Sequence, residues 1–228
     1  MSGVADAVAH VRPARKVRAR FSKAAGARDT IAGFGHGMDV AGLTFGQFSL
    51  IDLIQATLEI TGPADVVIST WSAGFYDVDA AKRFRDDGLL MSIRFVMDAA
   101  SMKTGQASVH DVAGLFGADA IRSTRTHAKF ALVRNDDWQV VITSSMNLNL
   151  NARCEQFEMT DDAERCAMFA GFVDALFEEL PVGGAKARNG DQSLPALSGL
   201  EAVQPNLGIS GVRSVSKLGR VSTGRATQ

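Results

Sequence analysis

The chain has 228 residues, of which 46% are hydrophobic, and its formal net charge is −1. These values predict one globular domain with extensions, or two small domains, with enough apolar residues for a sizeable core. A transmembrane helix is excluded because no apolar run reaches about 18 residues. The first residues lack the apolar stretch of a signal peptide, so we expect a cytoplasmic protein without stable membrane association.

The charge is distributed unevenly along the chain. Residues 1–28 contain seven Arg or Lys and one acid, residues 29–181 contain 11 basic and 22 acidic side chains, and residues 182–228 contain six basic and two acidic ones. An acidic middle is therefore flanked by two basic ends. Basic ends often bind polyanions such as nucleic acid, although solvated ends with no partner have the same composition.

Cysteine content does not indicate a secreted or zinc-binding scaffold. The chain contains Cys154 and Cys166, and neither lies in a CxxC pair. We expect reduced thiols in a reducing compartment, no zinc site and no other metal or cofactor.

The two ends of the chain are predicted to be flexible. Residues 1–35 have helix formers but no clean apolar face, so we interpret them as a basic arm. Residues 182–228 are rich in Gly, Ser and Pro and are expected to form a flexible tail. The domain that remains spans 36–181.

Within this domain, predicted helices and strands alternate. The helices are expected at 45–60, 77–88, 108–117 and 161–180, and the strands at 64–71, 89–98, 120–133, 138–146 and 155–160. Asp161 and Glu164 resemble a capping box at the start of the last helix. This order predicts an α/β fold, and the polar turn between the third and fourth strands makes the sheet mixed. We expect a mostly parallel sheet with helices on both faces.

A group of polar side chains falls on the expected hairpin. His127 and Lys129 are two residues apart, as are Ser145 and Asn147, so each pair lies on one face of its strand. Glu155 opens the next strand. An imidazole, an ammonium, a hydroxyl, an amide and a carboxylate are thus expected to meet at one end of the sheet. Lys129, Ser145 and Asn147 suit the binding of a phosphodiester, and His127 suits nucleophilic attack on it.

This pattern resembles the phospholipase D superfamily, whose signature is His-x-Lys, a hairpin, Gly/Ser-Ser-x-Asn and a Glu. Here it reads His127-Ala-Lys129, Ser144-Ser145-Met-Asn147 and Glu155, within a likeness that covers roughly residues 40–180. The segment 144–158 is similar to phage- and prophage-encoded members. The resemblance implies a phospholipase D-like catalytic domain at 36–181 and a metal-independent phosphodiesterase with a phosphohistidine intermediate. Glu155 is expected to hydrogen-bond the second ring nitrogen of the histidine.

The sequence departs from the family pattern in three respects. Arg134 stands near the place where the family has an aspartate, and Ser144 replaces the usual glycine. The third departure is that the chain has one His-x-Lys, because His10, His36 and His110 have no lysine two residues later. Single-motif members of the family form homodimers with two facing motifs, so the resemblance implies a homodimer in which the second His127 is the general acid.

Several functions are compatible with this pattern. We expect a nuclease acting on DNA or RNA, in the host cytoplasm if the protein is phage-encoded. The alternatives are a phospholipid hydrolase or phosphatidyl transferase, and a catalytically inactive nucleic-acid-binding phage protein. Trp71, Ser72 and residues 98–101 end two expected strands, where they either line the pocket or serve core packing and helix capping.

Overall fold

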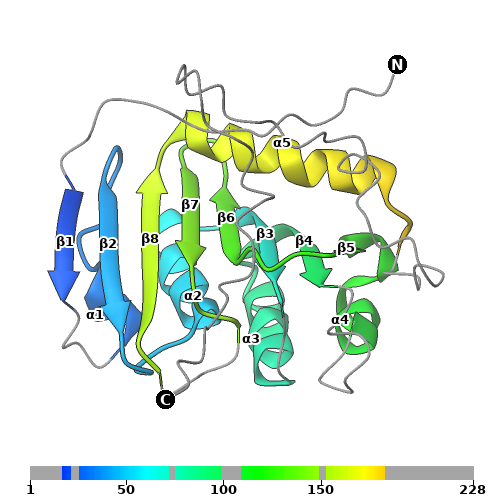
Figure 1. The fold of residues 1–228 in the computed structure, drawn as a ribbon, viewed down its shortest axis with the longest axis horizontal. Coiled ribbons are helices and arrows are strands. Elements are labelled where there is room, and N and C mark those ends of the chain that lie inside the picture. Colours follow the sequence, from blue (N-terminus) through cyan, green and yellow to red (C-terminus); the bar gives the residue numbers. More distant parts are fainter. Residues whose placement is uncertain (1–16, 22–25, 72–74, 99–108, 149–152, 183–228) are drawn as a thin grey trace, which may run out of the picture.

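The computed structural model describes residues 17–21, 26–71, 75–98, 109–148 and 153–182 (Figure 1). The strands in chain order are β1 (Val17–Phe21), β2 (Asp39–Thr44), β3 (Ala64–Thr70), β4 (Leu90–Asp98), β5 (Ile121–Thr124), β6 (Phe130–Arg134), β7 (Gln139–Ser144) and β8 (Glu155–Asp161). The helices are α1 (Ala27–Ile31), α2 (Leu50–Thr61), α3 (Phe75–Asp86), α4 (Val109–Phe116), the 3-10 turn η2 (Ala118–Ala120) and α5 (Ala163–Glu179).

The strands form one mixed sheet with the order β1-β2-β8-β7-β6-β3-β4-β5 (Figure 1). The expected mixed α/β fold is confirmed. Its expected mostly parallel character is corrected, because four of the seven pairings are antiparallel and three are parallel. The antiparallel pairings form a continuous block from β2 to β3, and the parallel pairings lie at the two sides of the sheet.

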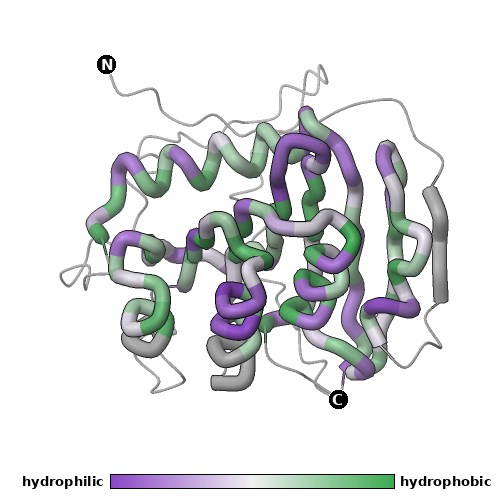
Figure 2. Tube along the Cα trace, turned by 180° about the vertical axis from the view of Figure 1, so that it is seen from behind, coloured by the Kyte–Doolittle hydropathy of each residue, from purple (hydrophilic) through white to green (hydrophobic). Residues whose placement is uncertain are grey.

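Helices cover both faces of the sheet. Figure 1 shows α5 across one face, and Figure 2, from behind, shows α2, α3 and α4 in front of the other. Side chains alternate accordingly along the central strands: Val66 and Ile68 of β3 belong to the core under α2, whereas Val67 between them belongs to the core under α5. Because successive strand residues point to opposite faces, a sheet covered on both sides has nearly continuous apolar strands.

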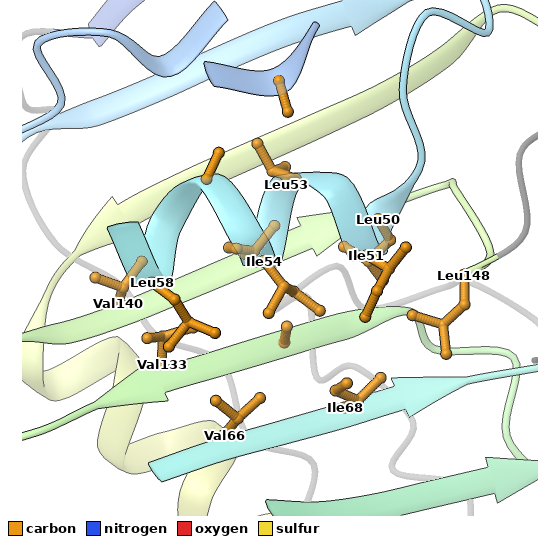
Figure 3. Close-up of a cluster of buried hydrophobic side chains, with 14 of the residues drawn as sticks. Leu50, Ile51, Leu53, Ile54, Leu58, Val66, Ile68, Val133, Val140 and Leu148 are labelled. Atoms are coloured by element: carbon orange, nitrogen blue, oxygen red, sulfur yellow. The ribbon is translucent and has the colours of Figure 1, made fainter. Parts of the chain in front are cut away.

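The larger core lies under α2. Figure 3 shows the apolar stripe of this helix against the sheet, with Ile51, Ile54 and Leu58 on the side of Val66, Ile68, Val133, Val140 and Leu148, and Leu53 on the other side of the helix. Leu50 belongs to the same core. These five leucine and isoleucine side chains are at most 1% exposed, and the sixth, Ile60, is partly buried. The Asp52 carboxylate accepts the Ser49 N–H at the helix start, and Gly62, at φ 72°, ends the helix. This core holds the central strands firmly at the positions from which the site residues extend.

The smaller core lies under α5, where it includes Cys166, Ala170 and Val173. This helix begins differently from the prediction. Asp162 is the N-cap and accepts the backbone N–H groups of Glu164 and Arg165. The capping role expected of Asp161 is therefore wrong. Its carboxylate instead accepts the backbone N–H groups of Gly37 and Gln139.

Part of the predicted basic arm has regular structure. Val17–Phe21 pairs with β2 in parallel, and Ala27–Ile31 forms α1, which contacts α2. Strand β2 itself was not expected, because Gly42 interrupts its strand-forming residues. A β-carbon at Gly42 would lie 2.5 Å from the Phe157 ring, so the glycine permits the close pairing of β2 with β8. Residues 1–16 and 183–228 lie outside the described residues, and the boundaries at 35 and 181 remain predictions.

The expected strand 120–133 is two strands that lie far apart in the sheet. β5 is at one side of the sheet and β6 is in its centre, with β4 and β3 between them. Residues 125–129 cross the ends of these two strands. A continuous apolar pattern does not reveal such a break, because each half alternates correctly by itself. The break places His127 and Lys129 before β6, not within it.

Candidate active site

Two hydrogen bonds fix the crossing segment 125–129 to the sheet. The Asp98 carboxylate, at the end of β4, accepts the Thr126 N–H at 2.9 Å. The Ser69 hydroxyl, near the end of β3, donates to the Ala128 carbonyl at 2.9 Å. Both anchors are buried. His127, which lies between the two anchored residues, is exposed at the end of the sheet where β3 and β7 finish and β6 and β8 begin. We call this the site end.

His127 and Lys129 share a face, as predicted. The Lys129 Nζ lies 3.3 Å from Nδ1 and 3.5 Å from Nε2 of the His127 ring. It also donates to the His127 carbonyl at 3.1 Å. The pair thus forms a unit in which an ammonium lies against an exposed imidazole. An anion that binds the ammonium is brought directly to the ring.

Lys129 is an unusual lysine because its side chain is buried at 8% exposure. Burial lowers its pKa, since it disfavours the charged form, and the nearby charge of Glu155 opposes this change. Lysine is rarely buried so deeply without a paired charge. A buried ammonium in an otherwise acidic domain is the arrangement expected of an anion-binding residue.

Ser145 and Glu155 form the second part of the site. The Ser145 hydroxyl donates to the Glu155 carboxylate and accepts the Gln156 N–H at 2.9 Å. Glu155 was expected to contact the histidine ring, but in the structure it accepts from Ser145. Its electrostatic interaction with Lys129 joins the two parts.

Asn147 follows β7 by three residues. Its side-chain oxygen is buried and has no hydrogen-bond partner among the described residues. Rotation of the amide group exchanges its oxygen and nitrogen, so the same position offers either an acceptor or a donor. An unpartnered buried amide is costly for stability, and such groups are concentrated at functional sites.

Arg134 lies at the opposite end of β6. It pairs in register with Asp65 of β3 and Gln139 of β7, about 13 Å along the strand from the residue that follows Lys129. Its Nε atom is buried without a hydrogen-bond partner among the described residues. The departure from the family pattern at Arg134 is thus at the far end of the strand from His127.

The structure decides two of the strand-end residues that the sequence left open. Trp71 is 37% exposed, and its ring centroid is 6.3 Å from that of His127, so it lies at the site. Asp98 positions the crossing segment. Ser72 and residues 99–101 lie outside the described residues.

Two more serines shape the site: Ser69, which sequence reasoning missed, and Ser144, whose hydrogen bonds it did not foresee. Ser69 anchors the crossing segment, and the Ser144 hydroxyl donates to the Gln156 carbonyl at 2.7 Å while accepting the Met146 N–H at 2.9 Å. The signal for Ser69 was a polar residue within an otherwise apolar strand, because a buried hydroxyl needs a partner.

The described part of the chain lacks two further classes of feature. No group of three or more His, Cys, Asp and Glu residues arranged to hold a metal ion occurs there. Among the same residues, no helix is long and apolar enough to cross a membrane.

Comparisons with known proteins give distant structural similarity. No family model matches the sequence, and no curated protein matches it. The fold is similar to Nuc, a phospholipase D family member from Salmonella typhimurium, at a TM-score of 0.47 and 16% identity over 63% of this chain and 96% of that one. NucT from Helicobacter pylori has the same TM-score and identity, over 63% of this chain and 99% of that one. TrmBL2, an archaeal chromatin protein, matches at a TM-score of 0.42 and 13% identity, over 66% of this chain and 55% of that one.

Proposed function

We propose that this protein is a phosphodiesterase that cleaves nucleic acid through a phosphohistidine formed on His127. The observation that carries the proposal is the exposed His127 ring with the buried Lys129 ammonium 3.3 Å from it. The ammonium attracts a phosphodiester and places the phosphorus next to a nitrogen nucleophile. Without such a cation, the negative charge of the phosphodiester repels nucleophiles.

The proposed reaction has two displacements. In the first, a nitrogen of neutral His127 attacks phosphorus, the P–N bond forms, and the P–O bond to the leaving strand breaks as that oxygen takes up a proton. In the second, water attacks phosphorus and gives its proton to the group that protonated the leaving oxygen, the P–N bond breaks, and neutral His127 is regenerated. Lys129, together with Asn147, holds the non-bridging oxygens. Glu155 holds Ser145 and balances the charge of Lys129. Every group in this scheme is a side chain, so activity is expected to persist in EDTA.

The leaving oxygen requires a proton donor, and we propose that a second copy of the chain supplies it through its own His127. Of the other histidines, His110 lies in α4, and His36 lies at the far end of the β6–β7 hairpin, where it is hydrogen-bonded to Asp161. Leu43 and Phe45, exposed at 37% and 61%, lie beside Glu155 across the β2–β8 pairing and supply apolar surface at the site end.

Subunit mixing tests this shared site. Wild type and His127→Ala are unfolded together in different ratios and refolded, with light scattering used to measure the oligomeric state. If each site needs both histidines, activity falls with the square of the wild-type fraction. A linear fall, or full activity in a monomer, would contradict the proposal of a shared site.

The basic N-terminal residues are proposed to add non-specific attraction to nucleic acid. Because Val17–Phe21 pairs with β2, the informative truncation removes residues 1–16, which contain Arg12, Arg15 and Lys16. We expect weaker binding and a shallower dependence of log K on log salt concentration, by up to about 0.9 per lost phosphate contact. An unchanged salt slope would show that these residues make no phosphate contacts.

One substrate panel tests the activity as a whole. The protein is incubated in EDTA with single-stranded DNA, duplex DNA, RNA and phosphatidylcholine vesicles, beside His127→Ala. We expect turnover of a nucleic acid that the variant lacks. Hydrolysis of phosphatidylcholine alone would favour the lipid alternative, and binding of nucleic acid without turnover of any substrate would favour the non-catalytic one.

A further inference from the structure

Trp71 is placed where a ligand of His127 would touch it. It directly follows β3, the neighbour of β6, and its side chain is 37% exposed. Its ring centroid lies 6.3 Å from that of His127, with the two planes inclined by 51°. The protein therefore leaves part of a large aromatic surface uncovered directly beside the proposed nucleophile.

The other tryptophan shows what a structural role looks like in this fold. Trp138 stacks on His36 at a centroid distance of 3.8 Å and lies 5.9 Å from Phe34, in a stack of three rings. It is one of the partly buried side chains packed against the core under α2. Trp71 lies in neither core cluster, and its recorded ring contact is the inclined one with His127. Core packing does not explain its position.

We propose that Trp71 is a stacking platform for the nucleobase next to the scissile phosphate, and that the substrate is therefore a single-stranded or locally unpaired nucleic acid. This inference rests on the proposed function, because it takes the phosphate position from His127 and Lys129. A base adjoining that phosphate is separated from it by one sugar. Trp71 lies at a comparable separation from His127, because it follows the strand next to β6 and its ring centroid is 6.3 Å from that of His127. In a duplex, both faces of each base are covered by its neighbours, so a paired base cannot stack on a protein ring without being extruded.

An exposed aromatic ring beside a phosphate site also suits a choline group through cation–π attraction. Recognition of a quaternary ammonium typically uses a cage of several aromatic rings. Trp71 offers one partly open ring, and the ring recorded next to it is the imidazole of the proposed nucleophile. A single open face suits a flat base better than a spherical cation, so Trp71 favours a nucleobase as its occupant.

Fluorescence tests the stacking without requiring turnover. The chain contains two tryptophans, so Trp138→Phe leaves Trp71 as the one indole reporter, and phenylalanine preserves the ring stack. His127→Asn in the same protein prevents cleavage. We expect oligothymidylate to quench Trp71, and a duplex or an abasic oligonucleotide of the same length to quench it much less. Equal quenching by the abasic strand, or quenching by phosphocholine and not by oligothymidylate, would overturn the proposal.

Cleavage kinetics give a second, independent test. The wild type, Trp71→Phe and Trp71→Leu are compared on a single strand and on the same strand lacking the base beside the cleaved phosphate. Stacking predicts that the missing base lowers the wild-type kcat/KM about 10-fold to 100-fold. On the intact strand, Trp71→Leu should lose as much kcat/KM as the wild type loses when the base is missing. Its kcat/KM should then be the same on both strands. Trp71→Phe should retain most of the wild-type preference for the intact strand.

The outcomes separate the two proposals. An equal loss on both strands in Trp71→Leu would mean that Trp71 merely positions His127, which overturns the stacking role and leaves the nuclease activity standing. Full activity of Trp71→Leu on both strands would also overturn the stacking role and leave the nuclease activity standing. If the wild type cleaves no nucleic acid, the proposed function fails, and the fluorescence measurement still decides whether Trp71 binds a base.

Discussion

Near each end of the β6–β7 hairpin, a histidine lies beside a tryptophan, but the two pairs are built differently. At the site end, exposed His127 is inclined to Trp71 at a centroid distance of 6.3 Å. At the other end, His36 stacks on Trp138 at 3.8 Å, and its Nδ1 lies 3.0 Å from the Asp161 carboxylate. The His36 side chain is itself 61% exposed, but one face of its ring stacks on Trp138 and its Nδ1 faces a carboxylate. The His127 ring is instead inclined to Trp71 and contacts the Lys129 ammonium, which leaves its face available to an anionic ligand.

The charged neighbours of the two histidines differ in the same way. The Asp161 carboxylate also accepts the backbone N–H groups of Gly37 at 3.1 Å and Gln139 at 3.0 Å, so it joins three segments of the chain. Lys129 carries a buried positive charge against the His127 ring. One end is arranged for stability and the other bears a cost in stability that an anionic ligand would offset. Matched substitutions at the two ends separate these roles.

The largest difference is expected between the two histidines. His127→Ala should lower phosphodiester cleavage by more than about 10⁴-fold, because it removes the nucleophile. His36→Ala should leave the cleavage rate unchanged and lower the free energy of unfolding by about 1 kcal/mol, because it loses a hydrogen bond and a ring stack. Steady-state rates and urea denaturation measure both effects. Equal loss of activity in the two variants would refute the assignment.

The next largest effect is expected at Lys129. Lys129→Met should lower the cleavage rate by about 10² to 10³-fold, since it removes a charged donor to the phosphate, without lowering the free energy of unfolding. Arg134→Met, at the opposite end of the same strand, is the matched control and should leave the rate unchanged.

The sign of the stability effect follows from the pKa of Lys129. Burial lowers this pKa, so the folded protein loses the proton at a lower pH than the unfolded chain does. Below that pH the wild type bears the cost of the buried charge, and Lys129→Met should be the more stable protein. As the pH rises toward the ordinary lysine value of about 10.4, the difference should narrow. A difference that widens with pH would contradict this account.

The next comparison is between the carboxylates at the two ends, Glu155 and Asp161, and a smaller effect on rate is expected for Glu155 alone. Glu155→Gln should reduce cleavage by about 10-fold, less than the loss of a direct phosphate donor. It should also move the alkaline loss of activity to lower pH, because Glu155 raises the pKa of Lys129. Asp161→Asn should instead leave the rate unchanged and lower the free energy of unfolding by about 1–3 kcal/mol. An unshifted pH–rate profile in Glu155→Gln would contradict the expected influence of Glu155 on the pKa of Lys129.

The two cysteines give the smallest expected effect. Both are free, with Cys154 exposed beside Glu155 and Cys166 buried on the side of α5 that packs on the sheet. Burial raises the pKa of Cys166 to about 11, so little reactive thiolate is present at neutral pH. A bulky maleimide should label Cys154 in the folded protein and slow cleavage several-fold, with Cys154→Ser as the resistant control. Mass spectrometry that found Cys166 labelled first would contradict the described packing.

The sequence predicted the parts of this molecule that depend on local pattern. Strands β3 and β4 were expected almost at their observed bounds, and the end of α2 was expected within one residue, because apolar spacing and the Gly62 stop are local signals. The start of α2 was expected at residue 45, five residues before its observed start at Leu50. The strand order was beyond such reasoning. The parallel and antiparallel pairings depend on contacts between distant residues, which is why the sheet was expected to be mostly parallel.

The same distinction applies to the site. The spacing of His127 and Lys129 correctly placed them on one face. It did not reveal that Lys129 is buried, that Glu155 accepts from Ser145, or that Trp71 lies against the histidine. The burial of Lys129 and its position beside Trp71 depend on how the crossing segment 125–129 passes over β3 and β4, and the contact of Ser145 with Glu155 depends on the pairing of β7 with β8. No local pattern records either arrangement.

Direct detection of the covalent intermediate is the strongest test of the account. The protein is mixed with an oligonucleotide in EDTA, denatured within milliseconds, digested at alkaline pH, where phosphohistidine survives, and analysed by mass spectrometry. The account predicts a phosphonucleotide adduct on the peptide that contains His127, in the wild type and in His36→Ala, and its absence in His127→Ala. An adduct on another residue, or cleavage that continues in His127→Ala, would contradict it.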